Sequence, residues 1–274
     1  MILSEIEARI KSKIESIGIP LKDWDIQINY GIKTGFNEAF IIDKAKRDEL
    51  LKKCPEAVDI IRPILKGRNI KKYIAEFDGL YVIFTRRGID IDLYPAVKEH
   101  LLKYYEKLKP KDENDLIGRK PGSYKWFEIQ DNVAYFEDFN KEKITWIELS
   151  DIPKFSYDNE NYFVEATAFI LTGVKIKFLT AYLNSKLSDW YFDKITTTSG
   201  VGTNRWKKIY IENFPIPLIG QETEKLFNEL IDNVIISKKK NNPIDGLDQQ
   251  INKQVLELYG FDEDEKDIIL NFHH

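Results

Sequence analysis

The spacing of hydrophobic residues along the chain predicts helices at both ends. Isoleucines recur three or four positions apart over residues 2–17 with charged residues between them, which is typical of an amphipathic helix. After Pro217 the same spacing predicts helices over residues 223–237 and 247–258. Asp262 followed three residues later by Glu265 predicts the capped start of one more short helix.

Between these ends the pattern alternates between strand and helix. Residues 24–43 alternate polar and apolar positions around Gly31 and Gly35, which predicts a strand, a loop and a second strand. Runs rich in β-branched and aromatic residues predict further strands over 80–85, 143–149, 154–157, 162–171 and 209–211. Helical spacing predicts helices over 44–54, 95–109 and 174–192. Polar segments predict loops over 109–124 and 196–204. The chain is therefore expected to be α+β, with a connecting helix in residues 1–25, a body in 26–220 and a helical tail in 221–274.

Composition narrows the class of protein. The 274 residues are 43% hydrophobic and 13% aromatic, which excludes a disordered chain. No apolar run approaches the roughly 18–20 residues of a membrane helix, and the acidic residues of the first helix exclude a signal peptide. Cys54 is the single cysteine, so no intramolecular disulfide can form. We expect a cytoplasmic protein without a membrane partner.

The net charge of −4 hides an uneven distribution. Residues 221–274 carry twelve acidic and six basic side chains, so the tail is −6 and residues 1–220 sum to +2. Basic residues gather without any acidic ones in residues 60–75 and again in 194–211. The bulk charge argues against indiscriminate nucleic-acid binding, but local patches of this kind can bind phosphate. Each patch taken singly is also compatible with an ordinary solvated face.

Residues that carry catalysis or bind metals are scarce. The three histidines are His100, His273 and His274, and with one cysteine they predict neither a zinc site nor a nucleophile–histidine pair. Neither a phosphate-binding glycine loop nor a dinucleotide fingerprint occurs. Acidic residues near strands could hold magnesium, but they form no compact acid–acid–lysine set of the nuclease kind. We expect this segment to bind without catalysing, with no cofactor of its own.

Several loops instead mix glycine, small polar residues, arginine, lysine and tryptophan. Lysine and hydroxyl side chains can hold phosphates, whereas arginine and asparagine can read base edges. Trp206 lies in the richest of these groups, where packing into the core is its simpler role. The candidate DNA-binding residues are Lys33, Thr34, Asn37, Arg68, Lys71, Lys72, Arg86, Arg87, Lys125, Ser199, Thr203, Asn204, Arg205, Lys207 and Lys208.

Several segments, in order, resemble the TaqI-like C-terminal specificity domain of type IIG restriction–modification enzymes. The strand–loop–strand start INYGIKTGFNEAFII (28–42) resembles the start of that family's domain. ILKGRNIKKY (64–73) resembles its "KGRDIKRY"-like segment, with Asn69 where aspartate is usual. YKWFE (124–128), KEKI (141–144), LNSKL (183–187) and FPIP (214–217) follow in the family's order, and residues 247–265 resemble its helical end.

The resemblance implies a twisted mixed or antiparallel β-sheet domain with flanking helices that recognises double-stranded DNA through residues 26–220. It also implies that a nuclease and an adenine-N6 methyltransferase, with S-adenosylmethionine and magnesium, belong to other domains. The methyltransferase's Asn/Asp-Pro-Pro-aromatic signature is absent here, because residues 213–217 do not match it. We therefore expect an excised or separately encoded recognition domain whose tail docks on those domains or on a second subunit.

Three other readings stay open. A stand-alone specificity subunit that recruits separate methyltransferase or nuclease chains predicts two recognition units per chain, whereas one is seen. An unrecognised enzyme needs a carboxylate cluster that the sequence does not show. A helical interaction protein with incidental basic loops predicts dimerisation without DNA binding. The target base sequence does not follow from the residues.

Overall fold

The computed structural model describes residues 3–112, 115–196 and 204–273. Its largest sheet has five strands in the order β2-β11-β7-β9-β5, all antiparallel to their neighbours except the parallel pair β5–β9. β11 is an inner strand, because it pairs with β2 on one side and with β7 on the other. The strands are β2 (Ile26–Tyr30), β5 (Tyr73–Ile74), β7 (Lys143–Ile147), β9 (Ser156–Asp158) and β11 (Ala168–Gly173).

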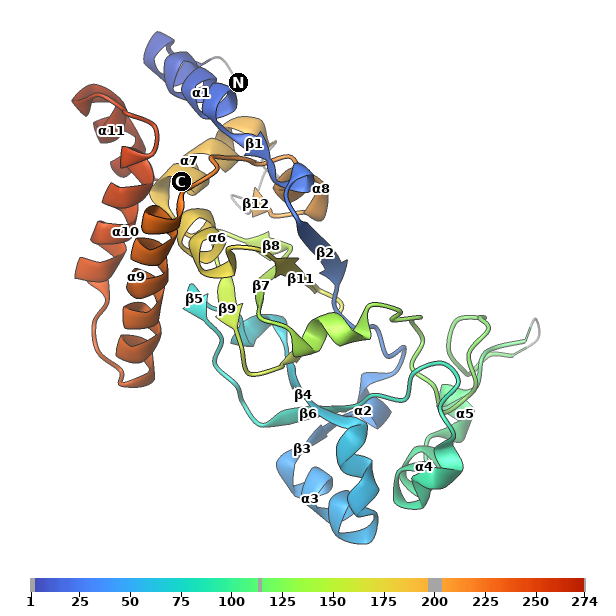
Figure 1. Ribbon diagram of the computed structural model, residues 1–274. Coiled ribbons are helices and arrows are strands. Elements are labelled where there is room, and N and C mark those ends of the chain that lie inside the picture. The colour runs from blue at the N-terminus through green and yellow to red at the C-terminus, as the bar shows by residue number, and fades with distance from the viewer. Residues whose placement is uncertain (1–2, 113–114, 197–203, 274) are drawn as a thin grey trace.

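A second sheet has the strand order β10-β4-β6-β3, with only β10–β4 parallel among its pairs. Its strands are β3 (Ile41–Asp43), β4 (Ile61–Leu65), β6 (Leu80–Ile83) and β10 (Phe163–Val164). Figure 1 shows this sheet at the lower end of the molecule with short helices around it. These helices are α2 (Asn37–Phe40), α3 (Lys44–Lys53), α4 (Pro95–Leu102) and α5 (Tyr105–Leu108).

The remaining helices gather at the other end, beside the five-stranded sheet (Figure 1). They are α1 (Glu5–Ile17), α6 (Ile176–Leu183), α7 (Lys186–Ile195), α8 (Lys208–Glu212), α9 (Gln221–Lys239), α10 (Asp245–Glu257) and α11 (Glu263–Leu270). Two short ribbons complete this part. β1 (Ile19–Pro20) pairs with β13 (Pro215–Ile216), and β8 (Leu149–Ser150) pairs with β12 (Asn204–Arg205). Single 3-10 turns connect elements at Leu21–Asp23, Pro55–Asp59, Gly67–Asn69, Ile91–Leu93 and Phe136–Asn140 (η1 to η5).

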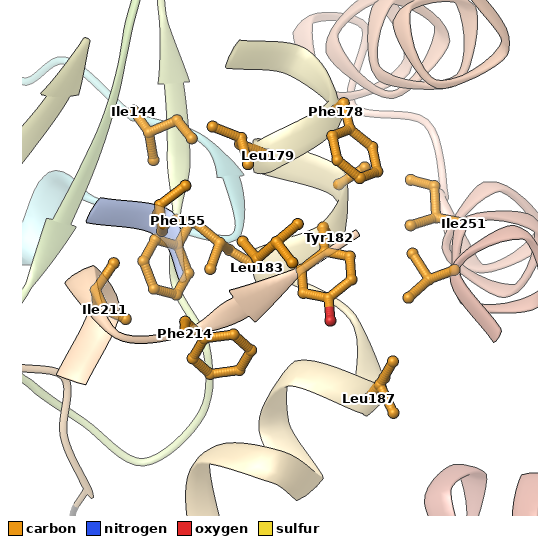
Figure 2. Packing of buried hydrophobic residues seen from close by; sticks show 14 of the residues in the cluster. Ile144, Phe155, Phe178, Leu179, Tyr182, Leu183, Leu187, Ile211, Phe214 and Ile251 are labelled. Atoms are coloured by element: carbon orange, nitrogen blue, oxygen red, sulfur yellow. The ribbon is translucent and has the colours of Figure 1, made fainter. Parts of the chain in front are cut away.

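The buried hydrophobic side chains form two clusters that meet at β11. Alternate residues of a strand face opposite sides of a sheet. Phe169 and Leu171 accordingly belong to the cluster under the helices, which we call the helical-side cluster. Ala168 and Ile170 belong to the cluster of the four-stranded sheet, which we call the small-sheet cluster. In Figure 2 Leu183 of α6 lies close to Phe155, at the sheet side of the helical-side cluster.

A buried carboxylate, that of Glu265, connects the N-terminal helix with the last helix. Glu265 is fully buried and accepts hydrogen bonds from Arg9 at 2.8 Å and from Lys13 at 2.6 Å. The same carboxylate receives the amide of Asp262, whose side chain caps α11. The cap predicted from Asp262 and Glu265 is therefore confirmed, and it also joins the two ends of the chain.

The α+β fold, with its twisted mixed sheets and C-terminal helices, is confirmed, but some predicted elements are wrong. The predicted helix over 174–192 is two helices, because the buried Asn184 bonds the backbone of Phe155 and Ser185 caps α7. The predicted helix over 95–109 is likewise divided at Lys103 and Tyr104. Residues 39 and 40, predicted as strand, end helix α2.

The predicted strand over 209–211 is helix α8. The Tyr210 and Ile211 amides both bond the Lys207 carbonyl there, so that Ile211 is buried while Ile209 is exposed.

Residues 197–203 of the predicted loop 196–204 lie outside the described part of the chain. Among the described residues, no helix is long and apolar enough to cross a membrane.

Candidate functional site

The turn between β10 and β11, residues 165–167, brings together loops that lie far apart in the sequence. Asn37 donates a hydrogen bond to the Glu165 carboxylate, and the Glu148 amide donates to the Thr167 carbonyl at 3.3 Å. A Cβ atom at Gly67 would lie 3.6 Å from the Thr167 hydroxyl oxygen. We call residues 165–167 the junction turn. The segments 33–37 and 67–72, which carry candidate DNA-binding residues, and the β8–β12 ribbon all meet around it.

The chain needs a glycine where β2 approaches this turn. A Cβ atom at Gly31 would lie 2.2 Å from the carbonyl oxygen of Glu165, closer than non-bonded atoms can approach. The neighbouring Ile32 amide donates to Val164 at 2.7 Å, and the Ile32 carbonyl accepts from Ala166 at 3.0 Å. Gly31 therefore lets the 33–37 loop leave the sheet directly against the junction turn.

Arg119 holds the loops on the other side of residues 33–37. Its buried guanidinium donates to the carbonyls of Leu108 at 2.7 Å, Thr34 at 2.8 Å and Glu128 at 2.8 Å. It also donates to the carbonyls of Lys125 at 3.3 Å and Trp126 at 3.0 Å. Burial lowers the pKa of Arg119 to about 10, so the side chain keeps its charge at neutral pH. The loops that carry Lys33 and Lys125 are thus one connected unit.

Five candidate side chains form no ion pair within the described part of the chain. They are Lys33, Lys71, Arg86, Lys125 and Lys207. Lys33, Arg86 and Lys125 are exposed, whereas Lys71 and Lys207 are half-buried. A cation without a carboxylate partner can neutralise a phosphate without first breaking an ion pair.

Arg68 and Arg205 are exposed arginines held by surface carboxylates near the junction turn. Arg68 bonds Asp78, and Arg205 lies 3.8 Å from Glu148. Their side chains are 63% and 51% exposed, so both pairs are well solvated. Such pairs contribute only about 0–1 kcal/mol, so a ligand can replace the carboxylate at little cost.

A family model describes this chain in the region of these loops. Residues 62–216, more than half of the chain, match the model of the TaqI-like C-terminal specificity domain. The chain belongs to this family. The match contains the motifs at residues 64–73, 124–128, 141–144 and 183–187, and all but the last residue of the motif at 214–217. Residues 28–42 and 247–265 lie outside the match.

Two solved structures share the fold of this specificity domain. The type IIL restriction–modification enzyme MmeI, solved in complex with DNA, matches with a TM-score of 0.62 at 13% identity over 92% of this chain and 36% of MmeI. The type IIG restriction endonuclease BpuSI matches with a TM-score of 0.54 at 13% identity, over 96% of this chain and 33% of BpuSI. The chain thus spans about a third of the length of either enzyme.

Other candidate residues of the specificity domain already have partners inside the fold. Thr34 is only 1% exposed, and its hydroxyl donates to Asn37 at 2.6 Å and accepts from the Phe36 amide at 3.2 Å. The Thr34 hydroxyl is therefore engaged inside the loop, and its DNA contact stays a prediction. Asn37 is exposed, but its amide is used by Glu165 and its oxygen by Thr34.

Three basic candidates are likewise engaged. Lys72 bonds Asp248 of the tail helix α10 at 2.7 Å. Arg87 donates to the carbonyls of Ile129 and Gln130. Lys208 donates to the carbonyl of Ile28 at 2.7 Å, which satisfies an acceptor on the edge strand β2. These side chains organise the loops, and we leave them out of the proposed contact surface.

The remaining candidates surround residues 197–203. Ser199 and Thr203 lie outside the described residues, and for Asn204 the structure gives only backbone pairing with Ser150. Trp206 is packed inward as expected. It is 1% exposed, stacks on Phe192 with ring centres 3.7 Å apart, and donates to the Ser150 carbonyl at 3.3 Å.

Sequence reasoning missed the two features that organise the site, Arg119 and the junction turn. Arg119 lies in a polar loop beside Lys120, where nothing local distinguishes a buried arginine from an exposed one.

In the described part of the chain, histidine, cysteine and acidic side chains form no group of three that could hold a metal. His100 is buried against the Ala39 carbonyl at 3.0 Å, and burial lowers its pKa.

Proposed function

We propose that this specificity domain recognises a short double-stranded DNA sequence as the target-recognition module of a type II restriction–modification enzyme that methylates adenine N6. The observation that carries the proposal is the membership of the TaqI-like specificity family. The accessible cations around the junction turn support it, because they give the domain a local surface of the right charge despite its net −4.

The cations divide between two tasks. Lys33, Lys71, Lys125 and Lys207 contact phosphates, which positions the duplex without reading it. Arg68 and Arg205 read base edges, because a guanidinium fork can bond two acceptors of guanine and discriminate by roughly 1–3 kcal/mol per base. Asp78 and Glu148 hold the two arginines near the junction turn before DNA arrives.

The chemistry of the reaction belongs to other domains in this proposal. Methyltransferase and nuclease domains of the same polypeptide, or of a partner subunit, bind S-adenosylmethionine and magnesium in the cytoplasm. The chain's span of about a third of MmeI and BpuSI supports this division. The tail helices α9 to α11 dock on those domains.

A gel-shift selection from a pool of random duplexes at about 150 mM salt, followed by fluorescence anisotropy with the selected duplex and the full 274-residue chain, tests the proposal. We expect enrichment of one sequence class, and we expect Arg68→Ala and Arg205→Ala each to weaken binding to it by roughly tenfold. Lys253→Ala is the control, since this exposed lysine lies in tail helix α10 in a similar surface ion pair. Binding that ignores both arginine variants would contradict the assignment of base readout. No binding, by the chain or by the enzyme that contains it, would overturn the proposed function.

A further inference from the structure

A hollow of about 340 Å³ lies where strands β4 and β6 approach the turn η5. Phe84, Phe136 and Phe163 line it, with ring centres of Phe84 6.2 Å from those of Phe136 and 5.0 Å from those of Phe163. Its volume falls at the lower end of the roughly 300–1,000 Å³ of small-molecule sites. Phe84 and Phe163 are buried and Phe136 is partly buried, so the three rings form an apolar part of the wall of the hollow.

Two arginines in this hollow have hydrogen-bonding capacity to spare. Arg62 donates to Asn140 at 2.7 Å, but its buried Nε–H has no partner in the described part of the chain. The guanidinium of Arg86 forms neither a hydrogen bond nor an ion pair with any described residue, and it lies 4.5 Å from the ring centre of Phe136. A buried donor left without an acceptor is unfavourable, so these groups point to an acceptor on a ligand.

Two carboxylates line the same hollow. Asp59 and Glu137 are within its walls, and neither forms an ion pair with a described residue. Asn140 bridges the two kinds of group, because it accepts from Arg62 and donates to Glu137 at 3.2 Å. Carboxylates repel a phosphate, and an apolar ligand would leave both arginines unpaired. The occupant should therefore carry acceptors on one edge and donors on another.

We propose that this hollow binds a guanine base. Guanine presents O6 and N7 as neighbouring acceptors, which match an arginine fork, and it presents N1–H and the 2-amino group as neighbouring donors, which match a carboxylate. Adenine carries a donor, its 6-amino group, where guanine carries O6. The base is unpaired, because the donor edge assigned to Glu137 or Asp59 is the edge that cytosine would occupy. Its source is a free guanine nucleotide or an unpaired guanine in DNA.

NMR titration of the isotope-labelled full chain with guanosine 5′-monophosphate tests the proposal, with adenosine 5′-monophosphate as the ligand control because it differs only in the base. We expect saturable shifts at Phe84, Phe136 and Phe163 with the guanine nucleotide, and binding weakened roughly tenfold or more by Arg86→Ala. Arg47→Ala is the matched control, since Arg47 also lies over a ring, that of Tyr81 at 4.8 Å, outside the hollow. Equal responses to the two nucleotides, or no response at the three rings, would overturn the proposal.

Two further arms separate the edges and the sources. Inosine 5′-monophosphate differs from the guanine nucleotide in lacking the 2-amino group. Glu137→Gln should therefore reduce the preference of the protein for the guanine nucleotide over inosine monophosphate. If neither Glu137→Gln nor Asp59→Asn changes this preference, the carboxylate contact is refuted. A duplex with one unpaired guanine that shifts the same rings more than one with an unpaired adenine identifies DNA as the source, and a response to the free nucleotide alone identifies the nucleotide. The inference is independent of duplex recognition, because the anisotropy experiment uses fully paired DNA. Retained signal dispersion in Arg86→Ala shows that loss of binding is not loss of fold.

Discussion

A single buried cation, Arg119, satisfies five backbone carbonyls, one at the end of helix α5 and four in loops. Its partners range from Thr34 to Glu128, and no carboxylate lies within ion-pair distance in the described structure. Burying an arginine is costly unless its donors are all used. The guanidinium therefore acts as a rigid connector whose geometry fixes where Lys33 and Lys125 are presented.

We predict that Arg119→Lys destabilises the protein by about 2–4 kcal/mol, because an ammonium has three donors and cannot reach five carbonyls from one position. Urea unfolding followed by circular dichroism measures the change in free energy. Arg68→Lys is the matched control, since the 63% exposed Arg68 should change stability by no more than about 0.5 kcal/mol. Equal stability of the Arg119→Lys protein and the wild type would show that water replaces the lost bonds.

The sequence predicted which residue types gather in the candidate loops, but not which way their side chains face. Arg68 and Arg87 are both arginines in basic stretches, yet one is exposed and the other bonds two carbonyls. Lys72 is paired with Asp248, a residue 176 positions away. Local patterns carry no information about such a partner. The sequence therefore predicts a list of candidate contacts, and the structure shows which of these side chains already have partners inside the fold.

At the scale of elements, the sequence predicts a helix end where the cap is local, but it does not predict a break inside a hydrophobic run. Helices α1, α9 and α10 follow the predicted spacing, and the cap of α11 is the one expected. The break between α6 and α7 depends on Asn184, whose amide bonds Phe155 from a distant strand region. The apolar stripe continues across that break, so periodicity alone predicts one helix.

The contact between helices α1 and α11 gives a prediction at this scale. Glu265→Gln should destabilise the protein by about 1–2 kcal/mol at pH 7, because it weakens charge-assisted bonds from Arg9 and Lys13 to a buried acceptor. Thermal unfolding measures the loss. Glu263→Gln is the control, since its side chain is 86% exposed in a surface pair with Lys266 and should change little. If both variants melt alike, the contact between the ends does not stabilise the fold.

The same contact has a defined pH dependence. Burial raises the pKa of Glu265, but the bonds from Lys13 and Arg9 outweigh burial and leave its pKa below the ordinary 4.5. A carboxyl with a lowered folded pKa contributes stability above its unfolded pKa and loses it as the pH falls through the folded value. The difference between wild type and Glu265→Gln should therefore be constant at neutral pH and shrink below pH 4.5. A difference that grows in acid would contradict this assignment.

At the scale of the whole molecule, β11 couples the two hydrophobic clusters. Its residues alternate between them, with Phe169 and Leu171 on the helical side and Ala168 and Ile170 on the side of the small sheet. The sequence predicted a strand here, but a continuous apolar run does not reveal that two separate clusters share it. A strand buried on both faces cannot leave one cluster without exposing the other. The clusters should therefore unfold together, as small cooperative proteins do.

Leu50→Ala tests this coupling from a distance. Leu50 is buried in the small-sheet cluster, whereas Trp24, Trp146, Trp190 and Trp206 all lie in the helical-side cluster. In a Trp126→Phe background, which removes the tryptophan beside the small sheet, fluorescence reports the helical-side cluster alone. Removing a buried leucine side chain costs about 2–5 kcal/mol, so coupled clusters require the fluorescence transition to move to lower urea together with the circular dichroism. Val58→Ala, at an exposed position beside the same cluster, should leave both transitions in place. A fluorescence midpoint unmoved by Leu50→Ala, with an earlier change in circular dichroism, would mean that β11 separates two independently unfolding parts.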